Sequence, residues 1–295
     1  MITRSVSQAL GTGHNWQTRL EPGSILTTDA PTRKMSASRP GTASTGLYQH
    51  SAEWFDIRYA QKDYGAEVAR FSRLAARVHP GAETLLDVAC GTGRHLEHLR
   101  FRYTVAGLDQ SPQLLGIAAS RLGEVPLHEA DMCDFNLGCS FDIVTCFFSS
   151  MPYLCDAERM RQSVACMATH LSPDGILFIE PGLTPSAYRE GEVVHNFRRT
   201  PERAISWMYV MRREGSLAVW DIQWLVGTRD GGVTSFVEHE EFSLFTTEQY
   251  VTAMRDAGLD AVHHARGLHG YGALLGRAAP WSADEKAVID DALAD

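Results

Sequence analysis

The sequence predicts an α/β fold with a doubly wound sheet, and three features of its residue pattern indicate this class. The apolar run at 85–88 leads into a turn with glycine at positions 91 and 93, and an amphipathic pattern follows. Strand-like and helix-like segments then alternate as far as residue 179, which is typical of a sheet covered by helices on both faces. Between 204 and 244 the apolar residues recur with period two, which predicts an antiparallel β insert.

The glycine turn predicts a ligand site. The segment LLDVACGTG at 85–93 is a strand followed by a tight turn, and Leu96 and Leu99 continue it as one face of a helix. A nucleotide-like ligand can lie against bare backbone at such a helix N-terminus. Glycine is required there because a Cβ would block the approach and because the turn needs positive φ.

The next strand narrows the choice of ligand. The run at 103–108 ends in Asp109, which lies 18 residues after Gly91. A carboxylate at that distance is placed to accept hydrogen bonds from ribose hydroxyls, as in sites for dinucleotides and for S-adenosylmethionine. The dinucleotide fingerprint requires a third glycine three residues after Gly93, but this position holds Leu96. The sequence therefore favours S-adenosylmethionine.

The periodicity of the apolar residues, together with helix-capping and turn residues, predicts the remaining elements. Helices are expected at 52–55 and 64–78, and the insert is expected to contain about three strands. A helix should begin at Thr246 with Gln249 completing its capping box and should end at Gly258. Strands at 261–265 and 272–276 would then complete the sheet, antiparallel at its edge, and Ser282 with Glu285 would cap a last helix.

Composition excludes several classes of function. The net charge of −9 is unlike the basic surface of a nucleic-acid-binding enzyme. The cysteines form no C-x-x-C pair, so we expect reduced thiols, no metal site and a cytoplasmic protein. No apolar run approaches the roughly 18 residues of a membrane span, so no membrane partner is expected.

Several segments resemble the class I S-adenosylmethionine-dependent methyltransferases. The resemblance is carried by residues 87–93, 107–111, 130–135, 141–146 and 171–177. Residues 148–150 (FSS) and 244–250 (LFTTEQY) resemble, more narrowly, bacterial N,N-dimethyltransferases that act on nucleotide-linked amino sugars in antibiotic pathways. The resemblance implies a seven-stranded Rossmann-like methyltransferase sheet with an antiparallel β insert after the fifth strand.

The resemblance also implies a division of the chain. We expect a flexible leader at 1–46, with a transit peptide or a start at Met35 as alternatives, because this stretch lacks apolar periodicity. The S-adenosylmethionine-binding core would span 47–181, and the insert at 182–244 would serve as lid, acceptor pocket or dimer contact. The end of the core sheet would span 245–280 and the C-terminal helix 281–295. Trp207, Trp220 and Trp224 suggest that the insert lines the acceptor pocket or joins a homodimer.

Site residues follow from the same resemblance. Asp87 would fix the loop for the methionine part, Asp109 would bind the ribose, Leu114 would cover the adenine, and the backbone carbonyl of Phe147 would receive the amino group. The full set of expected cofactor contacts is Tyr59, Tyr64, Asp87, Ala89, Cys90, Gly91, Gly93, Asp109, Gln110, Leu114, Asp131, Met132 and Phe147.

Tyr48 and Tyr153 are the expected catalytic residues that flank the acceptor. Tyr153 stands where some amino-sugar enzymes have histidine, and Gly182-Leu183 and Tyr271 replace a tryptophan-rich stretch and an arginine of some relatives. The expected reaction is N-methylation of a small-molecule amine, most naturally a nucleotide-linked amino sugar. Small-molecule O-methylation and an inactive partner subunit are the alternatives.

Overall fold

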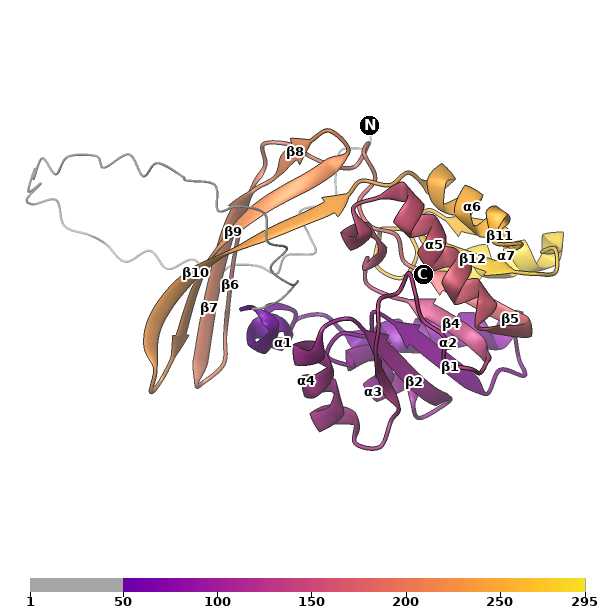
Figure 1. Ribbon diagram of the computed structural model, residues 1–295, viewed down its shortest axis with the longest axis horizontal. Coiled ribbons are helices and arrows are strands. Elements are labelled where there is room, and N and C mark those ends of the chain that lie inside the picture. Colours follow the sequence, from indigo (N-terminus) through magenta and orange to yellow (C-terminus); the bar gives the residue numbers. More distant parts are fainter. Residues whose placement is uncertain (1–49, 295) are drawn as a thin grey trace, which may run out of the picture. The chain divides into compact units, whose positions relative to one another are not determined.

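The computed structural model describes residues 50–294, so the expected leader at 1–46 and the catalytic candidate Tyr48 lie outside the described residues. Within this range the chain forms a larger and a smaller β-sheet (Figure 1). The larger sheet has seven strands in the order β11-β12-β5-β4-β1-β2-β3. Its strands are β1 (Thr84–Val88), β2 (Thr104–Asp109), β3 (Leu127–Glu129), β4 (Phe141–Cys146), β5 (Leu171–Ile179), β11 (Asp260–His264) and β12 (Ala273–Arg277).

The seven-stranded sheet is parallel except at one strand. β2, β1, β4 and β5 pair in parallel, whereas β12 pairs antiparallel with β5 and with β11. The outermost strand β11 therefore runs in the same direction as the parallel strands. The predicted antiparallel pairing at this edge is confirmed, and the reversed strand is β12, one position inside the edge.

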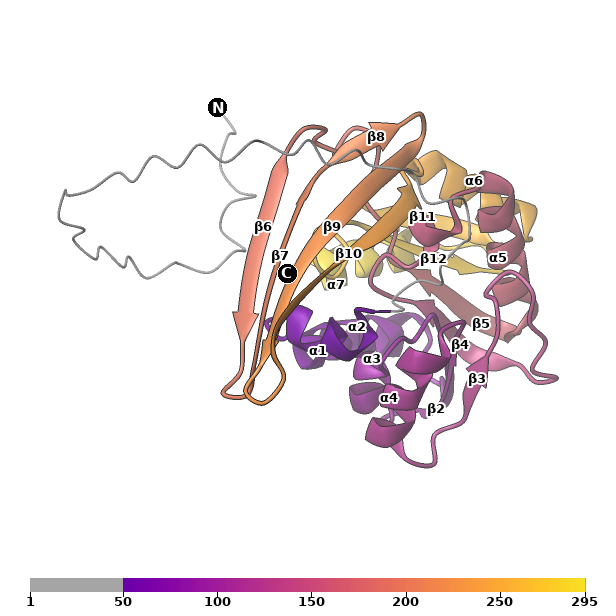
Figure 2. The same cartoon turned by 60° about the vertical axis from the view of Figure 1, so that its left-hand side comes forward.

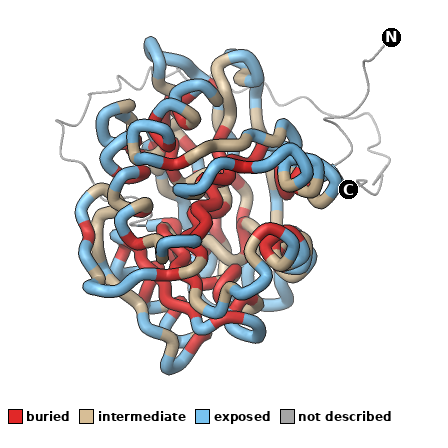
Figure 3. Tube along the Cα trace, turned by 90° about the vertical axis from the view of Figure 1, so that its right-hand side faces the viewer, coloured by how far each residue is buried: buried red, intermediate tan, exposed pale blue. Residues whose placement is uncertain are grey.

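Helices cover both faces of this sheet, as the doubly wound prediction requires. They are α2 (Tyr64–Val78), α3 (Arg94–Leu99), α4 (Pro112–Leu122) and α7 (Ala283–Ala294) on one face, and α5 (Ala157–Thr169) and α6 (Thr247–Asp256) on the other. Fully buried Phe71 and Leu96 belong to the first apolar layer, and Met160 and Met254 belong to the second. The tube view shows the buried residues concentrated between these layers (Figure 3).

Local signals in the sequence set the helix ends. The Asp63 side chain accepts a hydrogen bond from the Ala66 N–H and begins α2. Thr246 and Gln249 form the predicted capping box before α6, and Ser282 accepts the N–H of Glu285 before α7. The predicted helix at 52–55 is instead a 3₁₀ turn, η1 (Ala52–Trp54), followed by a single turn of α-helix, α1 (Phe55–Arg58).

The insert is an antiparallel sheet of five strands, so the expectation of about three strands is wrong. It has the order β10-β9-β7-β6, with β8 paired to β9. The strands are β6 (Val193–Arg199), β7 (Arg203–Val210), β8 (Arg212–Glu214), β9 (Leu217–Thr228) and β10 (Gly232–Ser243). β6 has no fully buried residue and β8 has only three residues, so neither strand has an apolar face that a sequence pattern could reveal.

The two faces of the insert differ in what they contact (Figure 2). On the inner face, Trp207 and Trp224 stack and pack against Trp54 and Ile57 of η1 and α1. The outer face carries exposed apolar side chains, namely Val193, Phe197, Met208, Val210, Leu225, Val233 and Val237. The inner face therefore forms a wall beside the short N-terminal helices, while the outer face has no apolar covering among residues 50–294.

This arrangement brings the carboxyl ends of four adjacent strands, β5, β4, β1 and β2, to one edge of the larger sheet. Ligands of open α/β sheets bind at that edge. The 3₁₀ turn η2 (Met151–Leu154) follows β4 there and contacts β10 of the insert. In the part of the chain that the structure describes, no helix is long and apolar enough to cross a membrane.

Candidate active site

The turn between β1 and α3 presents bare backbone at the carboxyl edge of the sheet. Ala89, Gly91 and Gly93 all have positive φ, at 59°, 56° and 74°. A Cβ on Gly93 would lie 2.7 Å from Leu122 Cδ1, so this glycine permits the close packing of the turn on α4. A Cβ on Gly91 would meet no atom within 4 Å. Gly91 therefore leaves open the space in which a ligand can approach the backbone.

Asp109 holds this turn in place from the end of β2. Its carboxylate accepts hydrogen bonds from the Gly91 N–H (2.8 Å) and from the Ser111 N–H (2.9 Å). Burial raises the pKa of the carboxyl, against the effect of these backbone hydrogen bonds. Each carboxylate oxygen can accept a further bond, so ribose hydroxyls can still be bound. Gln110 beside it is exposed.

Asp87 on β1 has a buried oxygen without a hydrogen-bond partner. Its Oδ1 accepts a bond from Thr145 Oγ1 (2.9 Å), but Oδ2 has no partner among the described residues. Burial raises the pKa of this carboxyl to about 8. A buried acceptor of this kind is expected to meet a donor when the site is filled. Cys90 lies in the turn after β1, and its side chain is buried. Its backbone N–H donates a hydrogen bond to the Leu108 carbonyl (2.9 Å).

The expected adenine-binding residues lie beyond β2 and β3. Asp131 accepts bonds from the Cys133 N–H (2.9 Å) and from Arg159 (2.7 Å). Burial would raise the pKa of Asp131, but these two bonds outweigh it and lower that pKa. Met132 is half-buried, and Leu114 is buried in the first turn of α4, where its N–H donates to Ser111 Oγ.

The segment after β4 is strained. Phe148 and Ser149 both have φ of 57°, a region that side-chain-bearing residues rarely adopt. The Phe148 N–H donates to Glu180 Oε2 (2.8 Å), and Ser149 Oγ donates to the Pro181 carbonyl (2.8 Å). The Phe147 carbonyl accepts a bond from Ser150 Oγ (3.1 Å) and has a second lone pair free to accept another.

The short helix α1 is fastened to the glycine turn. Asp56 accepts a bond from Thr92 Oγ1 (2.8 Å) and pairs with Arg121 of α4. Tyr59, just after α1, contacts the ring of Phe148 edge-on at 4.9 Å. Tyr64 instead lies over His95, with ring centroids 4.9 Å apart. Burial raises the pKa of both tyrosines, so both phenols are protonated at neutral pH and can donate hydrogen bonds.

Tyr153 lies on η2 and connects to the insert. Its hydroxyl donates to Glu240 Oε2 (3.2 Å), and Arg58 pairs with the other oxygen at 3.1 Å. Arg58 also lies over the rings of Tyr59 and Trp224, at 5.2 Å from each centroid. The structure thus joins α1, η2 and β10 at one buried acid, and sequence reasoning identified only Tyr153 in this group.

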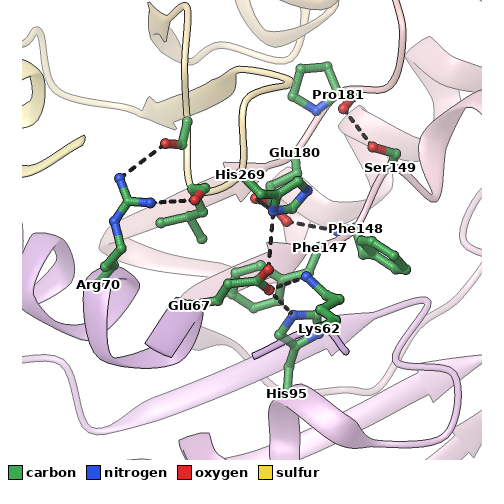
Figure 4. A network of polar contacts seen from close by, with 12 residues as sticks. Lys62, Glu67, Arg70, His95, Phe147, Phe148, Ser149, Glu180, Pro181 and His269 are labelled. Atoms are coloured by element: carbon green, nitrogen blue, oxygen red, sulfur yellow. Dashed lines mark hydrogen bonds and ion pairs between the residues drawn. The ribbon is translucent and has the colours of Figure 1, made fainter. Parts of the chain in front are cut away.

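Sequence reasoning also missed a polar cluster beside Phe147 (Figure 4). We call the five residues Lys62, Glu67, His95, Glu180 and His269 the charged cluster. Glu67 pairs with Lys62, lies 3.1 Å from His95 Nε2 and lies 3.5 Å from His269 Nδ1. Among the described residues, no group of histidine, cysteine and carboxylate side chains is arranged to hold a metal ion.

One member of the charged cluster had a signal in the sequence. Glu180 directly follows the apolar strand β5, just as Asp109 ends β2. His269 had none, because it lies in the irregular loop between β11 and β12.

The residues at this edge fit a ligand such as S-adenosylmethionine. The backbone at Gly91 is open to approach, and Asp87 Oδ2 lacks the donor that the ammonium group of a methionine moiety could supply. Asp109 is placed for hydroxyl groups, and the Phe147 carbonyl retains an acceptor position.

Comparisons with known proteins agree with this geometry. Residues 85–175 match the family model described as a methyltransferase domain. The dTDP-4-amino-2,3,4,6-tetradeoxy-D-glucose N,N-dimethyltransferase of Saccharopolyspora spinosa is 37% identical over 216 residues, covering 73% of this chain and 86% of that protein. The dTDP-3-amino-3,6-dideoxy-alpha-D-glucopyranose N,N-dimethyltransferase of Streptomyces fradiae is 36% identical over 228 residues, covering 76% of this chain and 89% of that protein.

Solved structures give the same result. DesVI of Streptomyces venezuelae superposes with a TM-score of 0.74 at 35% identity, covering 77% of this chain and 98% of that chain. CalS10 of Micromonospora echinaspora, an amino pentose methyltransferase with bound S-adenosylmethionine, has a TM-score of 0.70 at 34% identity, covering 79% and 99%. The chain therefore belongs to the S-adenosylmethionine-dependent methyltransferase family that includes these N,N-dimethyltransferases.

Proposed function

We propose that this methyltransferase transfers the methyl group of S-adenosylmethionine to the amine of a nucleotide-linked amino sugar in the biosynthesis of a secondary metabolite such as an antibiotic. The observation that carries the proposal is the similarity to amino-sugar N,N-dimethyltransferases over about three quarters of the chain. The inner wall of the insert, with half-buried Tyr209 and Trp220, supplies aromatic surface for a sugar nucleotide.

The cofactor residues take the roles expected from the resemblance. Asp109 binds the ribose while its bonds to Gly91 and Ser111 hold the turn. Asp87 fixes the loop that receives the methionine part, the Phe147 carbonyl receives its amino group, and Tyr59 and Tyr64 are the candidates for its carboxylate. The other expected cofactor contacts are Ala89, Cys90, Gly93, Gln110, Leu114, Asp131 and Met132.

The reaction is an in-line displacement at a methyl group that the sulfonium already activates. The protein's contribution is to hold the acceptor nitrogen on the axis of the breaking bond at roughly 3 Å. The nitrogen must be neutral to attack, whereas a free alkyl amine has a pKa near 10 and is protonated at neutral pH. Tyr153 is placed to orient the acceptor through its hydroxyl, which Glu240 holds at 3.2 Å.

An acceptor assay tests the proposal directly. We expect the protein to transfer one and then two methyl groups to a dTDP-linked 3-amino-3,6-dideoxyglucose. Mass spectrometry of the products measures both steps. The matched control is the sugar nucleotide with a hydroxyl in place of the amine, which should not react because a neutral amine is the better nucleophile. Methylation of the hydroxyl compound alone would favour O-methylation, and turnover of neither compound would contradict the proposed substrate class.

Replacing Asp109 tests the cofactor site. Asp109→Ala should weaken S-adenosylmethionine binding by about 1.5–3 kcal/mol, because it removes a charge-assisted contact to the ribose. It also removes the acceptor of the Gly91 and Ser111 N–H groups, so the melting temperature should fall. Asp109→Asn is the control, since its amide oxygen can keep one of these bonds. Calorimetry that finds unchanged affinity in folded Asp109→Ala would contradict the ribose role.

Tyr153→Phe tests whether this phenol positions the acceptor or removes its proton. We expect turnover to fall by no more than about ten- to a hundredfold, whereas loss of a general base typically costs 10²–10⁴-fold. The pH–rate profile should keep its midpoint, because a group that only positions the acceptor does not titrate in the reaction. A thousandfold loss together with a flattened profile would instead identify Tyr153 as the base.

We also propose that two copies of the chain pair through the outer face of the insert. Exposed Phe197, Met208, Leu225 and Val237 lie on four neighbouring strands, and β6 has an unpaired edge among the described residues. Leu225→Asp, at a side chain that is 51% exposed, should produce monomers in sedimentation experiments and leave the melting temperature unchanged. A monomeric wild-type protein at micromolar concentration would refute this pairing.

A further inference from the structure

The most unusual group outside the cofactor-binding residues is the carboxylate of Glu180. Its side chain is fully buried at the carboxyl end of β5. One oxygen, Oε2, accepts the Phe148 N–H and thereby holds the strained segment after β4. The other oxygen, Oε1, makes no hydrogen bond among the described residues, although His269 Nδ1 lies 3.1 Å away. An unsatisfied buried carboxylate is costly, so its retention calls for a ligand-based reason.

The positive charges around Glu180 do not balance the negative charges there. Within the charged cluster, Glu67 and Glu180 supply two carboxylates and Lys62 supplies one ammonium group, which is already paired with Glu67. Burial lowers the pKa of His95 to about 4, so this ring is neutral at neutral pH. When His269 is neutral the cluster therefore carries a net negative charge that falls on Glu180. A cationic ligand group, or a proton on His269, would neutralise it.

Glu180 connects the strained segment after β4 with the stretch of chain that leads toward η2. Phe147 and Phe148, at the cofactor side, are adjacent to it through the bond to the Phe148 N–H. On the acceptor side the chain continues through Gly182, where a Cβ would lie 2.6 Å from Pro152 of η2. The next residue, Leu183, packs in the same apolar cluster as Tyr153.

The loop that carries His269 is held rigidly against Glu180. Arg70 of α2 donates a hydrogen bond to the carbonyl of Leu268, the residue before His269 (Figure 4). It also donates to the carbonyl of Leu293 (3.3 Å). Gly267 in the same loop has φ of 58°, and a Cβ there would overlap the Gly272 carbonyl. The imidazole is therefore fixed between the two carboxylates of Glu67 and Glu180.

We propose that Glu180, assisted by His269, is the anionic subsite that binds the protonated amine of the acceptor and removes its proton. This inference rests on the proposed amine acceptor. One N–H bond of the ammonium group breaks, and the proton forms an O–H bond with Glu180. The freed nitrogen lone pair then attacks the sulfonium methyl carbon, and the pair of the breaking C–S bond stays on sulfur. His269 Nδ1, at 3.1 Å, takes the proton from Glu180 before a second methylation.

The protonation chemistry of Glu180 suits this role. Burial raises the pKa of its carboxyl, although His269 and the Phe148 N–H oppose the effect. A raised value brings the pKa of the carboxyl closer to the pKa of an amine, near 10. The smaller difference reduces the free energy needed to transfer a proton from the amine to the carboxylate. Glu67 shows the opposite behaviour. Burial would raise its pKa, but His269, His95 and Lys62 together hold it below its usual value.

The decisive variant is Glu180→Gln, which removes the charge but leaves an oxygen that can accept the Phe148 N–H. Two probes, the dTDP-linked amino sugar and its hydroxyl analogue, are titrated calorimetrically into protein loaded with S-adenosylhomocysteine. Wild-type protein should prefer the amino probe, and Glu180→Gln should lose that preference. Its kcat/KM for the amine should fall by about 10²–10⁴-fold at neutral pH and recover at higher pH, as solution deprotonates the amine.

Glu67→Gln is the comparison within the same cluster. It removes an equal charge but leaves the Glu180 carboxylate in place, so the preference for the amino probe should weaken, because Lys62 is then unpaired, yet persist. The two variants should also differ in stability at neutral pH. An acid with a raised pKa destabilises the fold as the pH rises through that pKa, so Glu180→Gln should melt at the same or a higher temperature. An acid with a lowered pKa stabilises the fold above its unfolded pKa, so Glu67→Gln should melt lower.

His269→Asn provides a second test that leaves the Phe148 bond intact. Measured as a single turnover, methylation should retain most of its rate, whereas steady-state turnover should slow by about tenfold or more, because Glu180 must lose its proton before each further methylation. The inference is overturned if Glu180→Gln binds both probes as the wild type does, or if His269→Asn slows the single turnover as much as it slows steady-state turnover. A wild-type protein that methylates no amino sugar would contradict the proposed function instead, which separates the two failures.

Discussion

The cost of keeping carboxylates away from water organises this site. Three of the four adjacent strands β5, β4, β1 and β2 place a buried acid at or near their carboxyl ends, in the form of Glu180, Asp87 and Asp109. Asp109 is satisfied by backbone N–H groups and so becomes a structural clamp on the glycine turn. Asp87 and Glu180 each keep one oxygen without a hydrogen bond. A ligand rich in donors and positive charge relieves that cost, which matches a sulfonium cofactor and an amine acceptor.

The same cost of burying a charge explains how α1 and η2 are joined to the insert. Glu240 is buried on β10 and is tolerated there because Arg58 and Tyr153 supply a charge and a hydroxyl. Three segments that are distant in the chain thereby share one acid. Removing one partner of such a buried pair is strongly destabilising, because the other charge is left uncompensated. The inner face of the insert, α1 and the catalytic candidate Tyr153 are consequently held in fixed positions relative to one another.

Strain at the carboxyl edge has a similar origin. Ala89, Phe148 and Ser149 adopt positive φ although none is glycine. Phe148 and Ser149 are held by hydrogen bonds to Glu180 and Pro181. Backbone in such conformations persists only where its surroundings over-determine it, and it clusters at functional sites. The segments that follow β1 and β4 are therefore preorganised before any ligand arrives.

Much of the cofactor side was predictable because its information is local. Asp87, Gly91, Gly93 and Asp109 lie within one strand–turn–helix–strand unit, where spacing alone determines which groups meet. The capping boxes before α6 and α7 were predictable for the same reason, since each lies within four residues. The number of insert strands was not, because β6 has no buried face and β8 is three residues long.

The sequence by itself determined the fold class, the glycine turn and the choice of an adenosyl cofactor over a dinucleotide, because these depend on contiguous periodicity and spacing. Only the tertiary structure decided how α1, η2 and the insert meet. Arg58 and Glu240 are 182 residues apart, and Tyr153 and Glu240 are 87 apart. The charged cluster likewise draws on α2, α3, the end of β5 and the loop before β12. Long-range pairing of buried charges depends on how layers pack, and no local pattern records it.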